Sequence, residues 1–191
     1  MSLSDFDACV IIGLDACVII GLDPIISDGC GWLVPFQKGG IYMEGFKSVD
    51  LKKAYTMIKS PAVVLTKGMK HYNITPYGWI MPLDYDPVTK VIFSSDPDHQ
   101  AVANIKRTGF FAVAFPLDPS ARWIEECGSV SNPDVNKYGM FSISASKASS
   151  LDLLVPTDKV SGWIEFKFIR SVPEGSVELM MGEAIAAFER E

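Results

Sequence analysis

Histidine is scarce in this chain of 191 residues, and the common signatures of metal and nucleotide sites are missing. The two histidines are His71 and His99, and no two of the four cysteines form a C-x-x-C pair. We therefore expect no metal site and no Ser-His-Asp triad. The sequence also lacks G-x-G-x-x-G, which disfavours a Rossmann fold.

Blocks of like charge and long apolar runs are absent as well. The net charge of −6 argues against nucleic-acid binding, which needs clustered Lys and Arg. Asp15 and Asp23 interrupt the N-terminal apolar runs, whereas a membrane span needs about 20 apolar residues. Asp5 and Asp7 stand where a signal peptide would carry Lys or Arg. We expect a soluble, cytoplasmic protein without nucleic-acid or membrane partners.

The cysteines fit that compartment as free or buried thiols, and disulfides are the less favoured interpretation. They are Cys9, Cys17, Cys30 and Cys127. Two glutamates directly precede Cys127 and should raise its thiol pKa, so a nucleophilic role is not expected.

An eight-residue segment at 7–14 recurs unchanged at 15–22. Each copy could form a short strand that ends at Gly13 or Gly21. Two copies do not make a solenoid, and we favour a duplication or an artefact of the recorded sequence. We therefore divide the chain into an N-terminal extension, 1–35, and one domain, 36–191.

The rest of the chain reads as short strands with a few helices, which predicts a mainly β protein, a barrel with helical decoration. Ser48 should cap a helix that carries Leu51 and Ile58 on one face, and Ser95 or Asp96 should cap a second helix that ends before Gly109. Short helices are expected at 121–127 and 135–141. The predicted strands are 62–66, 73–81, 91–94, 110–115, 162–169 and 177–188.

The predicted strand 73–81 contains residues that are poor choices for strand stability. Asn73, Thr75 and Gly78 indicate either a site where a ligand approaches the backbone or a β-bulge. Trp79 and Met81 could stack on a planar ring, although both are also ordinary core residues.

The start of the second predicted helix offers an anion site. Ser94, Ser95 and His99 surround the free N–H groups there, which suit a phosphate. Simple helix capping is the competing interpretation, and Asp96 and Asp98 would repel a phosphate.

Taken in order, these segments resemble the flavin reductase-like, FMN-binding split-barrel family, which includes flavoredoxin. The resemblance covers about 48–188. It rests on Asn73-x5-Trp79-x-Met81-Pro82, Asp86-Pro87, Ser94 to Pro116, Cys127-Gly128, Asp134 to Tyr138, and Gly175-x6-Gly182-Glu183.

This resemblance implies a split β-barrel of Greek-key type and a homodimer that binds FMN near its interface. Asn73, Thr75, Gly78, Trp79 and Met81 would line the flavin. The phosphate would be held by Ser94, Ser95 and His99, with Lys137 as the cationic partner. The sequence departs from the family pattern at Gly78, where a hydroxyl residue is usual, and at Val177, where histidine is common.

The implied function is an FMN-dependent oxidoreductase that takes hydride or electrons from NAD(P)H and needs no catalytic side chain. Two alternatives stay open. One is an electron carrier of flavoredoxin type with a redox-protein partner, and the other is a split-barrel binding module without turnover.

Overall fold

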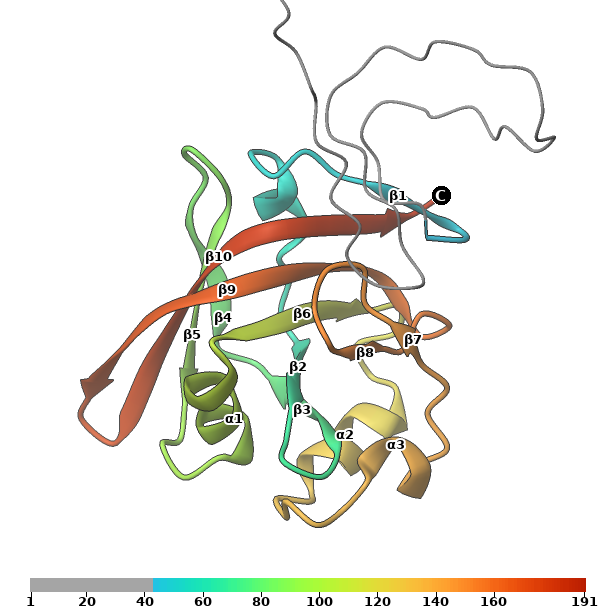
Figure 1. Cartoon of the computed structure of the whole chain (residues 1–191), viewed down its shortest axis with the longest axis vertical. Coiled ribbons are helices and arrows are strands. Elements are labelled where there is room, and N and C mark those ends of the chain that lie inside the picture. The colour runs from blue at the N-terminus through green and yellow to red at the C-terminus, as the bar shows by residue number, and fades with distance from the viewer. Residues whose placement is uncertain (1–42) are drawn as a thin grey trace, which may run out of the picture. The chain divides into compact units, whose positions relative to one another are not determined.

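The computed structural model describes residues 43–191, which form one antiparallel sheet with helices packed against it (Figure 1). The mainly β class expected from the sequence is confirmed. The strands are β1 (Phe46–Ser48), β2 (Ala62–Lys67), β3 (Tyr72–Tyr77), β4 (Ile80–Asp84), β5 (Lys90–Ser95), β6 (Phe110–Pro116), β9 (Val160–Glu174) and β10 (Val177–Arg190), with a separate pair, β7 (Ser146–Lys147) and β8 (Leu154–Val155). The helices are η1 (Ala54–Met57, 3-10), α1 (Gln100–Thr108), α2 (Arg122–Gly128) and α3 (Lys137–Met140).

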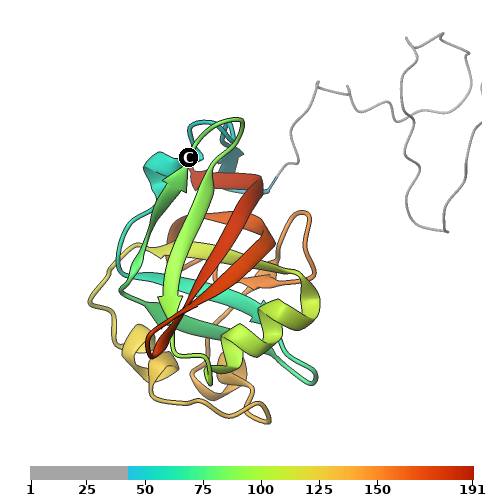
Figure 2. The same cartoon turned by 90° about the vertical axis from the view of Figure 1, so that its left-hand side faces the viewer.

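The strand order explains why the sheet curls into a split barrel. The order is β3-β2-β6-β9-β10-β5-β4, with β1 added on β10. Its two edge strands, β3 and β4, follow one another in the chain with only Gly78 and Trp79 between them. The sheet must therefore bend until its edges meet, and Figure 2 shows the strands curling around one another. The β3–β4 junction is the split.

Aromatic side chains fill the inside of the barrel. The Phe111 ring stacks on Phe166 with centroids 5.2 Å apart and meets Phe93 edge-on at 5.6 Å. A Cβ on Gly182 would lie 2.5 Å from the Phe111 ring, so this position of β10 accepts only glycine. The inner core thus holds β5, β6, β9 and β10 together by close packing.

The outside of β2, β3, β6 and β9 is covered by α2, α3 and the β7–β8 segment, as Figure 1 shows. Trp163 is fully buried there and stacks on Phe188 at 4.8 Å. Ile74 and Leu65 face this outer core, whereas Val64 and Tyr77 face the inner one. β3 therefore has one face toward each core.

The predicted helix after Ser48 is wrong. Ser48 ends β1, and only η1 forms. In an α-helix the carbonyl of Leu51 would accept the Tyr55 N–H. Instead that carbonyl accepts the Thr89 N–H at 2.8 Å, and the Tyr55 N–H donates to Thr89 Oγ1 at 2.8 Å. Thr89, at the tip of the β4–β5 hairpin, thus forms hydrogen bonds with both groups that an α-helix would have joined to each other.

The single predicted strand 73–81 is also wrong, because it is two strands broken at Gly78 and Trp79. β3 pairs with β2, and β4 pairs with β5. One segment therefore supplies both edges of the sheet.

The second predicted helix begins later than expected. Its N-cap is His99, not Ser95 or Asp96. Asp96 Oδ1 accepts the Asp98 N–H at 2.9 Å, and the Asp96 carbonyl accepts the His99 N–H at 3.1 Å. This turn precedes the helix and delays its start. The predicted end is confirmed, because Gly109 has a φ of 77° and caps α1.

The N-terminal repeat, Cys9, Cys17, Cys30 and the proposed boundary at residue 35 lie outside the described residues. Within 43–191, no helix is long and apolar enough to span a membrane. Cys127 is a buried free thiol, as expected for this residue.

Candidate functional site

Asn73 and Thr75 lie on the face of β3 that points into the barrel. They share this face with Tyr77, since side chains two residues apart in a strand point the same way. Asn73 Nδ2 donates to Thr75 Oγ1 at 3.0 Å and lies 3.5 Å from Thr66 Oγ1. The structure thus brings together the first two predicted residues in a polar cluster.

That cluster extends to α1 through residues that the sequence did not single out. Asn104 Nδ2 donates to Thr66 Oγ1 at 3.0 Å, and Gln100 Nε2 donates to Asn104 Oδ1 at 2.9 Å. Asn104 is almost fully buried, at 1% exposure. A polar residue three positions after Ala101, on the apolar face of the helix, was the available signal. The chain of amides and hydroxyls fixes α1 against the β2–β3 hairpin.

Gly78 and Trp79, at the split, are both exposed. The Gly78 carbonyl accepts a hydrogen bond from Ser60 Oγ at 2.5 Å, and a Cβ at Gly78 would meet nothing within 4 Å. Trp79 is 75% exposed, so it is not a core residue of this chain. Met81, on β4, is 61% exposed and pairs with Ile92 of β5.

Ser94 lies beside Trp79, and its N–H donates to the Trp79 carbonyl at 3.0 Å. Its hydroxyl is buried and has no hydrogen-bond partner in the described residues. A buried hydroxyl without a partner costs free energy, so it marks a place where another group can bind. The exposed side chains of Trp79 and Met81 and the buried hydroxyl of Ser94 therefore lie in one region around the ends of β4 and β5.

Ser95 points to the opposite face of β5. Ser95 Oγ lies 2.8 Å from the Tyr77 hydroxyl and 3.5 Å from His99 Nδ1, and it donates to the Asp96 carbonyl at 3.1 Å. Burial raises the pKa of Tyr77 to about 12, so its phenol stays protonated. The structure joins Ser95 to His99 but not to the hydroxyl of Ser94.

Lys137 is buried at 3% exposure on the other side of β3. Its Nζ donates to the carbonyls of Ile74 at 3.0 Å and Cys127 at 2.8 Å, and burial lowers its pKa. Within 43–191, Lys137 makes no hydrogen bond or ion pair with Ser94, Ser95 or His99. It fastens the end of α2 to the strand segment between Asn73 and Thr75.

The thiol of Cys127 has a pKa raised to about 11, and burial is the main cause. Glu126 adds to this rise, as expected from the sequence, whereas Lys137 opposes it. The described part of the chain holds no group of three or more His, Cys, Asp or Glu side chains that could bind a metal.

Comparison with known proteins identifies the family of this chain. The model of the flavin reductase like domain matches residues 55–191. An FMN-binding domain of a flavin reductases-like enzyme from Shewanella baltica OS155 is similar in structure, with a TM-score of 0.65 and 24% identity over 76% of this chain and 77% of that chain. Flavoredoxin from Methanosarcina acetivorans gives a TM-score of 0.61 and 20% identity, over 69% and 68%.

Nitrilotriacetate monooxygenase component B from Bacillus cereus gives a TM-score of 0.62 and 15% identity, over 72% and 73%. Identities this low show a shared fold. No curated protein matches the chain. The family match spans most of the sequence and confirms the resemblance, so this protein belongs to the flavin reductase-like domain family.

Proposed function

We propose that this protein is an FMN-dependent oxidoreductase of the flavin reductase-like class. The observation that carries the proposal is the region at the split, where exposed Trp79 and Met81 adjoin the unpartnered buried hydroxyl of Ser94. When bound, FMN supplies the hydride and electron chemistry. The residues of this chain bind and orient it, and none is assigned as a general acid or base.

The side chains at the split fit a flat, partly polar ligand. Trp79 offers an aromatic face, and the space around Gly78 leaves its backbone open. Asn73 and Thr75 lie on the inward face of β3, where their amide and hydroxyl hydrogen-bond to each other, so we propose that they border the site from inside the barrel. These groups are suited to line the flavin.

For the phosphate we propose the hydroxyl of Ser94 together with the free backbone N–H groups at the start of α1. Ser95 lies on the opposite face of β5 with His99 beside it, and we propose that they hold the turn before α1 in place. Asp96 and Asp98 are exposed in the same turn and oppose an anion. We propose that Lys137 stabilises β3 and does not bind the phosphate itself, because its ammonium already donates hydrogen bonds to two backbone carbonyls. Its role is then to hold Asn73 and Thr75 in position.

The visible spectrum of the purified protein tests this proposal. We expect flavin absorption bands that are released on denaturation, or that appear when FMN is added to colourless protein. Ser94→Ala should weaken FMN binding about tenfold, the effect of one lost hydrogen bond to a charged group. Ser146→Ala removes an exposed hydroxyl on β7 and serves as the matched control.

Comparing the affinities for FMN and for riboflavin, which lacks the phosphate, separates the contribution of the phosphate from that of the flavin ring. If Ser94→Ala weakens both ligands equally, the Ser94 hydroxyl does not bind the phosphate. A protein that stays colourless and binds no added FMN would overturn the function and leave a binding module.

A carrier of flavoredoxin type is the second candidate, supported by a cationic surface near β3 that is described below. Adding NADH or NADPH under anaerobic conditions separates the two candidates. Prompt bleaching of the flavin supports the reductase. Reduction by a protein donor alone supports the carrier.

We also propose a homodimer, formed through the outward face of β4, β5, β9 and β10. Met81, Leu83 and Ile169 are all at least 45% exposed on this face. Leu83, Ile169 and Met181 also line a hollow there, whose other lining residues, Asp84, Lys90 and Arg170, are charged. A second copy would cover this apolar surface and the hydroxyl of Ser94. The free thiol of Cys127 is compatible with the cytoplasmic location expected from the sequence.

A further inference from the structure

Three cationic side chains gather where the β2–β3 hairpin meets α1 and β7. We call this the cationic patch: Lys67, Arg107 and Lys147, around Tyr72 and Asp152. Lys147 Nζ donates to Asp152 Oδ1 and to the Tyr72 hydroxyl, both at 2.7 Å. Lys67 pairs with the other oxygen of Asp152, and Arg107 donates to the Lys67 carbonyl.

The patch has three cations and one carboxylate, in a chain whose net charge is −6. The side chains of Lys67 and Lys147 are 40% and 65% exposed, and Arg107 is exposed as well. Hydrogen bonds from Lys147, Lys67 and Tyr72 hold the pKa of Asp152 well below its usual range. The carboxylate stays ionised at neutral pH, so these side chains carry a local charge of +2.

A buried carboxylate fixes the loop that presents Lys147 and Asp152. Glu165, on β9, has no exposed surface. Its oxygens accept the backbone N–H groups of Ser149, Ser150 and Leu151 at 2.8–2.9 Å. The loop is therefore held in one conformation before any partner arrives, which lowers the entropy cost of binding.

The patch begins one residue beyond the proposed flavin site. Lys67 pairs with Tyr72 across the hairpin, and the next pair is Thr66 with Asn73. Consecutive Cα atoms lie about 3.8 Å apart. Met69, at the turn of the same hairpin, is 82% exposed and adds an apolar contact. A protein docked on the patch would thus lie next to the backbone of Asn73, on the face of β3 opposite to the Asn73 side chain.

We propose that the cationic patch docks an acidic electron-carrier protein. The inference rests on the proposed function, because it assigns the redox partner of that site. Acidic partners are repelled by the rest of this chain and attracted by the patch, so charge orients the encounter. Such contacts are small and sensitive to salt.

The geometry favours a protein over a small anion. Asp152 already occupies the space between Lys67 and Lys147, so a phosphate would have to displace it. A protein surface can instead offer separate carboxylates to the outward sides of the cations, where each remains exposed.

Binding of an oxidised, acidic [2Fe–2S] ferredoxin to the full chain tests the proposal, because no electron transfer is involved. We expect micromolar affinity that weakens as salt rises from 50 to 500 mM. The variant K67E/R107E/K147E should lose at least tenfold in affinity, because three attractive charges become repulsive. K67Q/K147Q, a milder change, should lose about threefold if the triple variant folds poorly.

The control K47E/K52E/K59E changes the net charge equally at exposed sites outside the patch and should bind nearly as the unaltered protein. Equal losses in both triple variants, or none in the patch variants, would overturn the proposal. Displacement of the ferredoxin by 2′,5′-ADP would assign the patch to a nucleotide instead. FMN binding is measured separately by absorbance, so loss of the flavin function and loss of docking are distinguishable.

Discussion

At the scale of single residues, buried polar groups that form hydrogen bonds decide the local structure. Glu165 accepts hydrogen bonds from Ser149, Ser150, Leu151 and the Trp163 indole. In the sequence it reads as one polar residue inside an apolar strand, with no sign of its partners. The same holds for Lys137, whose partners are backbone carbonyls 10 and 63 residues away. Sequence patterns cannot show such partners, because every residue carries the same carbonyl.

Replacing Glu165 should destabilise the protein strongly. Glu165→Ala leaves three backbone N–H groups without an acceptor and should lower the free energy of unfolding by at least about 3 kcal/mol. Glu165→Gln keeps one acceptor oxygen and should lose roughly half as much. Urea denaturation measures both. Glu174→Gln, at the exposed end of β9, should change stability by less than about 0.5 kcal/mol. Near-equal stabilities of Glu165→Ala and this control would contradict the role of Glu165.

At the scale of elements, the sequence correctly predicted a helix end that depends only on neighbouring residues. Gly109 ends α1 as expected, because a left-handed cap needs no distant partner. The start of α1 was missed because the Asp96 turn competes with helix capping. The break between β3 and β4 was missed for a different reason: Gly78 was recognised as unusual, but only pairing with β2 and β5 divides the segment. Tertiary pairing therefore accounts for this error.

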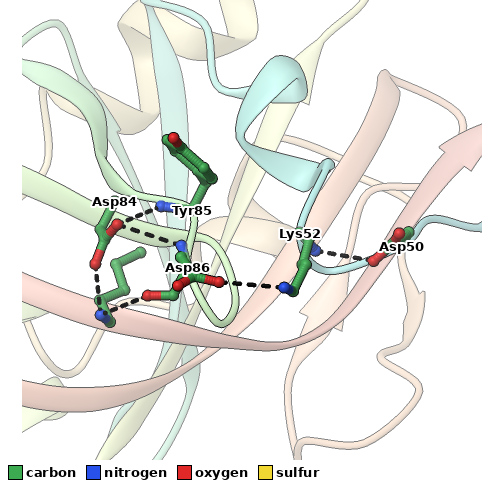
Figure 3. Close-up of polar contacts among 6 residues, drawn as sticks. Asp50, Lys52, Asp84, Tyr85 and Asp86 are labelled. Carbon is green, nitrogen blue, oxygen red and sulfur yellow. Dashed lines mark hydrogen bonds and ion pairs between the residues drawn. The ribbon is translucent and has the colours of Figure 1, made fainter.

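Charged side chains stabilise the hairpin formed by β4 and β5, as Figure 3 shows. Asp84 accepts hydrogen bonds from Lys90 Nζ at 2.7 Å and from the N–H groups of Tyr85 and Asp86. Lys52 reaches Asp86 from the turn before η1 at 3.1 Å. The hydrogen bond from Lys90, followed by the two backbone bonds, lowers the pKa of Asp84 from 3.8 to about 2.

This shift predicts a pH dependence. The ionised form of Asp84 stabilises the fold, so its contribution is complete above pH 3.8 and is lost as the pH falls through about 2. Asp84→Asn should melt at a lower temperature than the unaltered protein at pH 7, and the difference should vanish near pH 2. Thermal denaturation from pH 2 to 7 measures this. Because Asp84 is exposed, salt should reduce the difference at pH 7. A difference that persists unchanged at pH 2 would rule out the carboxylate as its cause.

At the scale of the whole molecule, the class of fold followed from many short strands with Gly and Pro between them. The candidate site followed only in part. The sequence brought forward Asn73, Trp79, Ser94 and Ser95, but it placed Ser95 at a helix N-cap, whereas Ser95 is the last residue of β5 and faces away from Ser94. Which face each occupies depends on the register of β5 with β4 and β10. The outward face of these strands carries the exposed apolar side chains of Met81 and Leu83 beside charged residues such as Asp84 and Lys90.

New charged residues on that face should prevent the proposed dimer. Met81→Lys combined with Ile169→Lys places an ammonium at two positions that are 61% and 45% exposed in the single chain, so the fold should be retained. Burying both unpaired charges in an interface should raise the dimer dissociation constant at least about a hundredfold. Light scattering after size-exclusion chromatography measures the mass. Met69→Lys, at the turn of the β2–β3 hairpin, should remain a dimer. If the unaltered protein is a monomer at every concentration, or if the double variant still dimerises, this face is not the interface.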